Sequence, residues 1–247
     1  MNAANRWAIY IDVEGTSKLY TKDADQFHAG FGKLLGAVYA IGDQVYPEPP
    51  ARLFAHQVGG DGIVIVSDFE EDSPERFVSI AVILLEVLLV NGLVGKAGIS
   101  TGTFYDIQGC VPSLREVPNA NDAAYSMGAG LLTTLKVMGT ALVNSHHFAE
   151  VPPRGSRLAV EPALLMKIAP GAVISDFGGP VVVDRIHTKT ATIEHIIKTA
   201  GLDLPTSSEL KKKLIAYVSS TGPLADTEWG RNTLSLNGCS PDGATAS

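Results

Sequence analysis

Two acidic residues stand at positions where short strands end, and acids placed in this way can bind cations. Asp12 follows the apolar stretch 7–11, which is typical of a buried strand. Asp61 belongs to the sequence Gly-Gly-Asp-Gly at 59–62, which lies between two apolar runs and predicts a tight hairpin, because these residues tolerate turns with positive φ. Two strands can thus bring two carboxylates to one place, as sites for divalent cations and nucleotide phosphates require.

Each of these acids also fits a purely structural role. Aspartate is common in turns and at the starts of helices, so Asp12 or Asp61 taken singly is equally well explained by local structure. Glu14 lies close to Asp12 in the sequence and is either part of the same site or a solvated acid. The pair, rather than either residue, is therefore the basis of the functional hypothesis.

The hydrophobic pattern predicts the elements that would position this pair. Apolar residues at steps of three and four favour an amphipathic helix over 27–41, and a largely buried helix is expected over 74–91. A strand is predicted over 95–102, with 104–107 as a candidate strand that pairs back on it. The order is then β-α-β-β-α-β, the ferredoxin-like arrangement of an α+β protein.

Further strands and helices are expected in the C-terminal part of the chain. They are one or two helices over 123–148, short strands at 157–160, 171–177 and 180–186, and helices at 190–200 and 207–219. We predict a core domain over 5–186, a helical extension over 187–236 and a disordered tail over 237–247.

Composition excludes several classes of protein. In 247 residues, 45% hydrophobic and 18% charged residues are typical of a globular chain with a sizeable core. Two distant cysteines support neither a disulfide framework nor a zinc site. A net charge of −7 argues against nucleic-acid and anionic-membrane partners, and the apolar run 80–90 is interrupted by Glu86 and too short to span a membrane. We see no secretory signal and expect a cytoplasmic protein.

Three motifs resemble those of the class III nucleotidyl cyclase domain in order and spacing. They are Ile-Asp-Val-Glu-Gly at 11–15, Gly60-Asp61, and Gly-Ile-Ser-Thr-Gly at 98–102, and the resemblance covers residues 5–165. It implies that 5–186 is a cyclase domain, a phosphorus–oxygen lyase. In this family the two aspartates hold two Mg²⁺ or Mn²⁺ ions per site.

The resemblance also implies roles for the residues next to Asp12. The carbonyl of Val13 would be a further metal ligand, and the backbone N–H groups of Gly15, Thr16 and Ser17 would bind phosphate oxygens. In the implied reaction the ribose 3′-hydroxyl attacks the α-phosphorus of its own triphosphate and expels pyrophosphate. Paired metals assist both the attacking and the leaving oxygen in many phosphoryl-transfer sites.

Departures from the family pattern concern the base. Gln57 stands where adenylate cyclases have lysine and guanylate cyclases have glutamate, so its amide either contacts the base or simply lines a strand. A compact stand-alone cyclase that lacks the purine-reading residues and carries His-Gln-Val-Gly-Gly-Asp-Gly at 56–62 is similar to the bacterial pyrimidine cyclases of the Pycsar antiphage system. This resemblance implies conversion of UTP to 3′,5′-cyclic UMP, with CTP as second choice, and a product that acts on a separate effector protein. An adenylate cyclase with altered base recognition, or a catalytically degenerate nucleotide-binding regulatory domain, stays open.

Family cyclases are head-to-tail homodimers in which a helix donates an asparagine and an arginine to the partner's site. The corresponding positions are Val143 and His147, with Asn144 one step away, so Asn144 and His147 are candidate catalytic residues or a polar helix surface. Tyr46 either stacks on the base or packs on the core. Arg154 either binds phosphate or is an exposed loop residue.

Overall fold

A mixed sheet forms the centre of the molecule. The computed structural model describes residues 4–48, 51–67, 71–106, 124–127, 130–133, 137–168, 171–176, 180–220 and 226–239. Within these ranges the sheet has the order β2-β3-β1-β4-β8-β10-β9. Its strands are β1 (Ala4–Val13), β2 (Leu53–Val58), β3 (Gly62–Ser67), β4 (Gly95–Asp106), β8 (Leu158–Val160), β9 (Ile174–Asp176) and β10 (Val181–Val183). The short β7 (Val137–Met138) pairs with β4, and β5 (Ala124–Met127) pairs with β6 (Gly130–Thr133).

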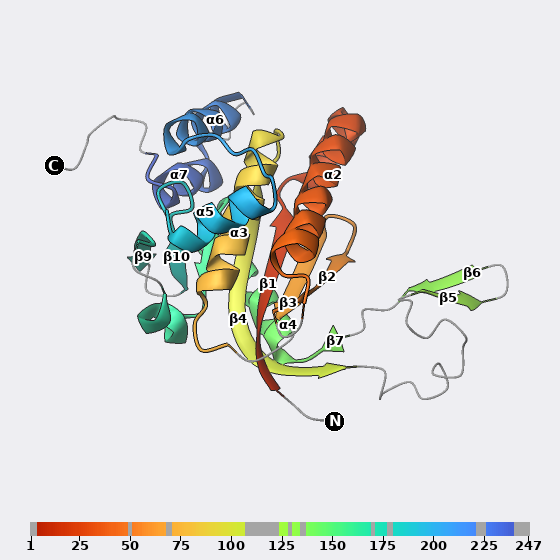
Figure 1. The fold of residues 1–247 in the computed structure, drawn as a ribbon. Coiled ribbons are helices and arrows are strands. Elements are labelled where there is room, and N and C mark those ends of the chain that lie inside the picture. Colours follow the sequence, from red (N-terminus) through yellow and green to blue (C-terminus); the bar gives the residue numbers. More distant parts are fainter. Residues whose placement is uncertain are drawn as a thin grey trace.

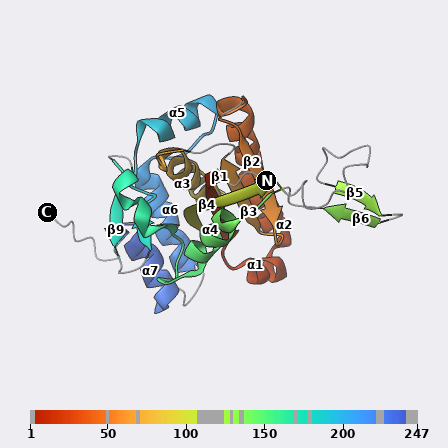
Figure 2. The same cartoon turned by 90° about the horizontal axis from the view of Figure 1, so that it is seen from below.

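Helices cover both faces of this sheet (Figures 1 and 2). On one face lie α2 (Ala24–Ala40), α3 (Glu75–Val90) and α5 (Ala191–Thr199), and on the other lies α4 (Thr140–Glu150). The remaining helices are α1 (Thr16–Lys22), α6 (Ser207–Ser220), α7 (Glu228–Leu236), a π-helical turn (Ile41–Val45) and a 3₁₀ helix (Pro162–Lys167). Strand and helix order along the first 106 residues confirms the predicted β-α-β-β-α-β arrangement and the α+β class.

Alternation along β1 separates the core from the face that carries the candidate site. Ile9 and Ile11 are fully buried in the main core with Leu34 of α2 and the apolar face of α3. Ala8 belongs to a smaller apolar cluster with Ala141 of α4. Because successive side chains of a strand point to opposite faces, Asp12 shares the α4 side of the sheet.

Two glycines of β4 allow α4 to lie directly on the strand. A Cβ atom at Gly98 would lie 2.1 Å from the carbonyl oxygen of Ser145, and one at Gly102 would lie 2.5 Å from the backbone nitrogen of Ala141. Any larger residue would separate the helix from the sheet. The Gly98–Gly102 motif therefore has a steric function in this fold, in addition to its place in the sequence pattern.

Two predictions about secondary structure are wrong. Residues 124–127 and 130–133, expected to be helical, form strands, and α4 begins only at Thr140. Small residues there are as compatible with a hairpin as with closely packed helices. The candidate strand at 104–107 is not separate, since β4 continues unbroken to Asp106 and Ile107 lies outside the described residues.

The C-terminal part is more ordered than predicted. Helix α7 was not expected, and Asn237 and Cys239, assigned to a disordered tail over 237–247, are fully buried. Residues 240–247 lie outside the described ranges. Leu214 of α6 and Leu234 of α7 share a cluster with Leu89 of α3. The domain boundary at 186/187 stays a prediction.

Among the described residues, no helix is long and apolar enough to cross a membrane.

Candidate active site

Asp12 and Asp61 are brought together at one end of the sheet, as predicted. In the antiparallel pairing of β1 with β3, Asp12 lies opposite Gly62, and the N–H of Val13 donates to the carbonyl oxygen of Asp61 at 3.3 Å. Gly59 and Gly60 have φ values of 66° and 99°, so the hairpin uses the conformations for which glycine is favoured. The sequence prediction of a hairpin that presents Asp61 is confirmed.

The surroundings of the Asp12 carboxyl disfavour its charged form. Its pKa is raised to about 6, chiefly by burial and also by the negative charge of Asp61, against the opposing effect of Lys96. The two acids are thus close enough to repel each other. A bound cation would relieve this repulsion, which is the physical property expected of a pair of metal ligands.

Lys96 is the centre of an ionic cluster that sequence analysis missed. It lies opposite Asp12 in the pairing of β1 with β4, and its Nζ is 3.4 Å from Asp12 Oδ2, 3.4 Å from Glu14 Oε1 and 2.7 Å from Glu150 Oε1. Burial alone would lower the pKa of Lys96, but Glu150, Glu14 and Asp12 raise it. One ammonium is therefore shared by three carboxylates, and the cluster keeps an excess of negative charge.

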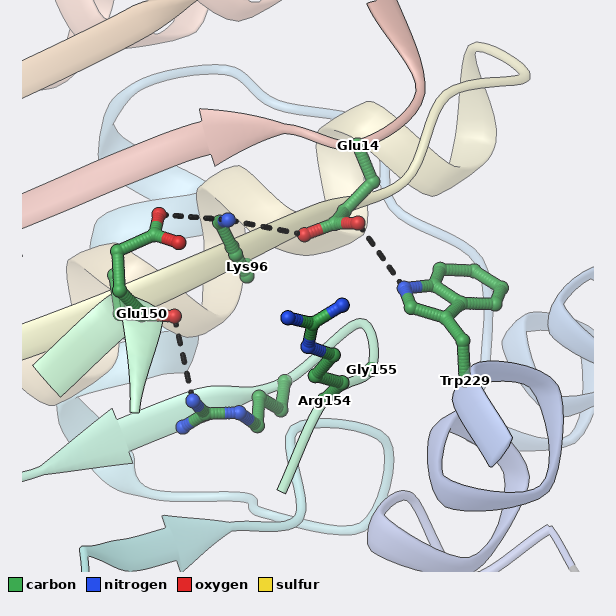
Figure 3. A pocket seen from close by; sticks show the side chains of 8 residues that line it. Glu14, Lys96, Glu150, Arg154, Gly155 and Trp229 are labelled. Atoms are coloured by element: carbon green, nitrogen blue, oxygen red, sulfur yellow. Dashed lines mark hydrogen bonds and ion pairs between the residues drawn. The ribbon is translucent and has the colours of Figure 1, made fainter. Parts of the chain in front are cut away.

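A cavity of about 300 Å³ lies beside this cluster. Its lining residues are Glu14, Lys96, Ala149, Glu150, Arg154, Gly155, Arg157 and Trp229. Figure 3 shows the Arg154 guanidinium pointing into the space between Lys96 and Trp229. Among the described residues Arg154 has no hydrogen-bond or ion-pair partner, whereas the buried Arg157 donates to the carbonyls of Phe148 and Val151 at the end of α4.

The segment after Asp12 forms the start of α1. Gly15 precedes the helix with φ 75°, and Thr16 Oγ1 donates to the carbonyl oxygen of Val13 at 2.9 Å. Ser17 is exposed in the first turn. First-turn N–H groups of a helix have no intrahelical acceptor. The roles of Val13, Gly15, Thr16 and Ser17 toward metal and phosphate stay predictions.

The two residues predicted to contact the base lie at opposite ends of the sheet. The Arg76 guanidinium lies over the Tyr46 ring, 4.9 Å from the centre of that ring. Tyr46 is near the Leu53 end of β2, which is the opposite end of the sheet from Asp61. Gln57 is exposed, and its amide donates to the carbonyl oxygen of Gly60 at 2.8 Å, which stabilises the hairpin turn. The structure therefore groups Gln57, but not Tyr46, with the acid pair.

The helix residues are likewise separate from the acid pair of the same chain. Asn144 Nδ2 donates to the carbonyl oxygen of Thr101 at 3.4 Å, five residues along β4 from Lys96. His147 is exposed, and the Val143 side chain keeps 67% of its accessible surface. From α4, it is Glu150 that reaches the cluster.

The residues at the site fit a cation such as Mg²⁺ that takes only one or two ligands from the protein, and not one whose ligands all come from the protein. Among the described residues, no group of three or more His, Cys, Asp or Glu side chains could by itself hold a metal ion. Mg²⁺ commonly uses one or two carboxylates, with water and substrate phosphates as the other ligands. Asp12 and Asp61, with their mutual repulsion, match this donor set.

Comparison with known proteins gives a distant structural likeness. Two solved structures, both of a bacterial light-regulated adenylyl cyclase, align with 80% of this chain at 11% identity and a TM-score of 0.46. The aligned part covers 56% of each of those chains, so this chain spans little more than half of their length. No protein-family model and no curated protein sequence matches this chain.

Proposed function

We propose that this protein is a nucleotidyl cyclase that converts a pyrimidine nucleoside triphosphate, preferentially UTP, to its 3′,5′-cyclic monophosphate and pyrophosphate. The observation that carries the proposal is the pair Asp12 and Asp61, two mutually repelling carboxylates at the ends of β1 and β3 in a β-α-β-β-α-β fold. The reacting bond forms between the ribose 3′-oxygen and the α-phosphorus. The bond from that phosphorus to the β-phosphate oxygen breaks, and the hydroxyl proton is released.

In this proposal the protein's own residues bind and orient the triphosphate. Asp12 and Asp61, with the carbonyl of Val13, would hold two Mg²⁺ or Mn²⁺ ions, which when bound acidify the 3′-hydroxyl and neutralise the leaving pyrophosphate. Arg154 lines the cavity beside Asp12 and offers positive charge to the phosphates. Positioning of this kind supplies much of the rate in phosphoryl transfer.

The base preference rests on the sequence resemblance and on Gln57. Its amide is exposed at the hairpin next to Asp61, from where it can donate to or accept from a base edge. Incubation with Mn²⁺ and each of ATP, GTP, CTP and UTP, followed by mass spectrometry, tests this directly. Cyclic UMP or cyclic CMP as the main product supports the proposal, whereas cyclic AMP favours the adenylate cyclase alternative.

Loss of one carboxylate should abolish catalysis without unfolding the protein. We expect Asp61→Asn to lower product formation at least about 100-fold, because a metal ligand contributes several kcal/mol to stabilising charge in the transition state. Asp203→Asn, which changes an exposed acid between α5 and α6, is the matched control and should retain full activity. Circular dichroism and the melting temperature check that both variants fold. Equal activity of the two variants would exclude a catalytic role for Asp61.

A homodimer with sites at the interface is part of the proposal. It is supported by the position of Asn144 and His147 apart from the acid pair of their own chain, since Asn144 contacts Thr101 of β4 and His147 is exposed on α4. Mixing Asp61→Asn with His147→Ala, each inactive alone, should restore about a quarter of the wild-type activity if exchange is free, because some dimers regain one intact site. Sedimentation velocity gives the assembly state. The product would then act on a separate effector in antiphage defence.

The alternative of a nucleotide-binding regulatory domain has one observation in its favour. Lys96 already provides a positive charge 3.4 Å from Asp12, so the acid is partly compensated by the protein itself. In that case the protein would bind nucleotide with Mn²⁺ and form no product from any of the four triphosphates. Equilibrium dialysis beside the product assay separates binding from turnover.

A further inference from the structure

The C-terminal helix reaches the candidate site through one hydrogen bond. Trp229 of α7 donates from Nε1 to Glu14 Oε2 at 3.0 Å, although the two residues are 215 positions apart in the sequence. The other carboxylate oxygen, Oε1, lies 3.4 Å from Lys96 Nζ. Both oxygens of Glu14 are therefore held, one by α7 and one by β4 (Figure 3).

Helix α7 is fastened to the part of the chain that carries Arg154. The N–H of Ser156 donates to Thr233 Oγ1 at 2.9 Å, and Asn237 Nδ2 donates to the carbonyl oxygen of Ser156 at 2.9 Å. Gly155 allows this approach, since a Cβ atom there would lie 3.1 Å from the backbone nitrogen of Thr233. Two hydrogen bonds to Ser156 thus hold the helix that presents Trp229 to the cavity.

We propose that Trp229 is a positioning residue of the nucleotide site, which holds Glu14 so that Arg154 stays available to the substrate phosphates. This inference rests on the proposed function. Trp229, Glu14 and Arg154 line the same cavity. A Glu14 carboxylate that has lost the indole N–H can turn toward the Arg154 guanidinium across the cavity that both residues line, because a carboxylate oxygen without a donor gains by a charge-assisted hydrogen bond. The Arg154 charge would then be neutralised by Glu14 and would no longer attract the triphosphate.

Removing the indole N–H while keeping an aromatic ring tests this role. Trp229→Phe should raise the KM for the triphosphate about tenfold, because Arg154 would then lose its charge-assisted hydrogen bond to a substrate phosphate. The kcat should stay within about twofold of the wild-type value. The chain has a second tryptophan, Trp7, whose Nε1 donates to the Glu71 carbonyl at 2.8 Å away from the cavity. Trp7→Phe is therefore the matched control, and its KM should equal that of the wild type.

A double-mutant cycle shows whether Trp229 acts through Glu14. In a Glu14→Ala background, Trp229→Phe should have no further effect on KM, because the group that Trp229 holds is absent. Equal effects of Trp229→Phe on KM in both backgrounds would show that Trp229 does not act through Glu14. If Trp229 had only a structural role, Trp229→Phe would lower the melting temperature and would change KM and kcat together.

Tryptophan fluorescence separates this inference from the proposed function. In the Trp7→Phe variant, Trp229 is the sole tryptophan, and its emission should change when Mn²⁺ and a triphosphate are added. Binding of each radiolabelled triphosphate is measured independently by equilibrium dialysis. If the wild type binds and cyclises a triphosphate but Trp229 emission and the Trp229→Phe affinity are unchanged, this inference is wrong and the proposed function stands. If the wild type neither binds nor turns over any triphosphate, both are wrong.

Discussion

Glu86 is a carboxyl group buried in the middle of α3. Its side chain has no accessible surface, and neither carboxylate oxygen has a hydrogen-bond partner among the described residues. Burial raises the pKa of Glu86 to about 7, against the opposing charges of Lys189 and Arg185. The folded protein therefore keeps a proton on Glu86 at pH values where the unfolded chain has lost it. The associated stability is present at low pH and is lost as the pH rises through 7.

Replacing Glu86 with an uncharged isostere should remove this pH dependence. Between pH 4.5, the ordinary pKa of the group, and pH 8, we expect the free energy of unfolding of Glu86→Gln to increase relative to wild type by about 2–3 kcal/mol. Urea unfolding followed by circular dichroism at several pH values measures the difference. Glu48→Gln, at an exposed position, is the control and should show no such slope. A constant difference for Glu86→Gln would contradict burial of the charge.

Helix α4 packs closely on β4, which places Glu150 next to Lys96. This packing depends on Gly98. The Gly98→Ala variant would place its Cβ 2.1 Å from the Ser145 carbonyl and 2.5 Å from the Ala149 nitrogen, both in backbone that cannot move alone. We expect a loss of at least about 2 kcal/mol of stability, since overpacking forces backbone shifts.

Gly36→Ala provides the matched comparison for this substitution. Gly36 is exposed in α2, and a Cβ atom there meets nothing within 4 Å. This variant should gain about 0.5–1 kcal/mol, because alanine is the better helix former. Urea unfolding compares the two variants, and similar stabilities would argue against direct contact of α4 with the strand.

Arg185 joins three distant parts of the molecule. It is fully buried and donates to the Leu85 carbonyl of α3 at 2.7 Å, to Ser156 Oγ at 3.0 Å and to Asn237 Oδ1 at 3.1 Å. Burial lowers the pKa of Arg185 to about 10, and the guanidinium is stabilised by these acceptors. The C-terminal end is thus part of the same polar network as the core helix.

Loss of Asn237 should therefore weaken the whole fold. Asn237→Ala leaves Arg185 Nε without its acceptor and Ser156 O without its donor, which should cost about 2–4 kcal/mol. Ser235→Ala, at an exposed position of α7, should change stability by less than about 0.5 kcal/mol. Thermal unfolding of both variants measures this. Equal melting temperatures would indicate that the C-terminal end does not support the core.

Local features of the sequence predicted the framework and the acid pair. The apolar stretch 7–11 gave β1, steps of three and four gave α2, and Pro74 at the start of an apolar run gave α3. The glycine-rich turn at 59–62 gave the hairpin that sets Asp61 next to Asp12. These features depend on neighbouring residues and on turn chemistry, which a single stretch of chain contains. The same local signals misassigned residues 124–127 and 130–133, where small residues fit either a helix or a hairpin.

Tertiary structure alone decided the surroundings of the acid pair. Lys96 faces Asp12 because β1 and β4 pair in one register, and a shift by one residue would turn it to the opposite face. Trp229 reaches Glu14 only because α7 is fastened to Ser156, and Tyr46 is kept at the far end of the sheet by the direction of β2. Contacts between residues so far apart in sequence leave no local pattern, since they depend on which elements pair and pack.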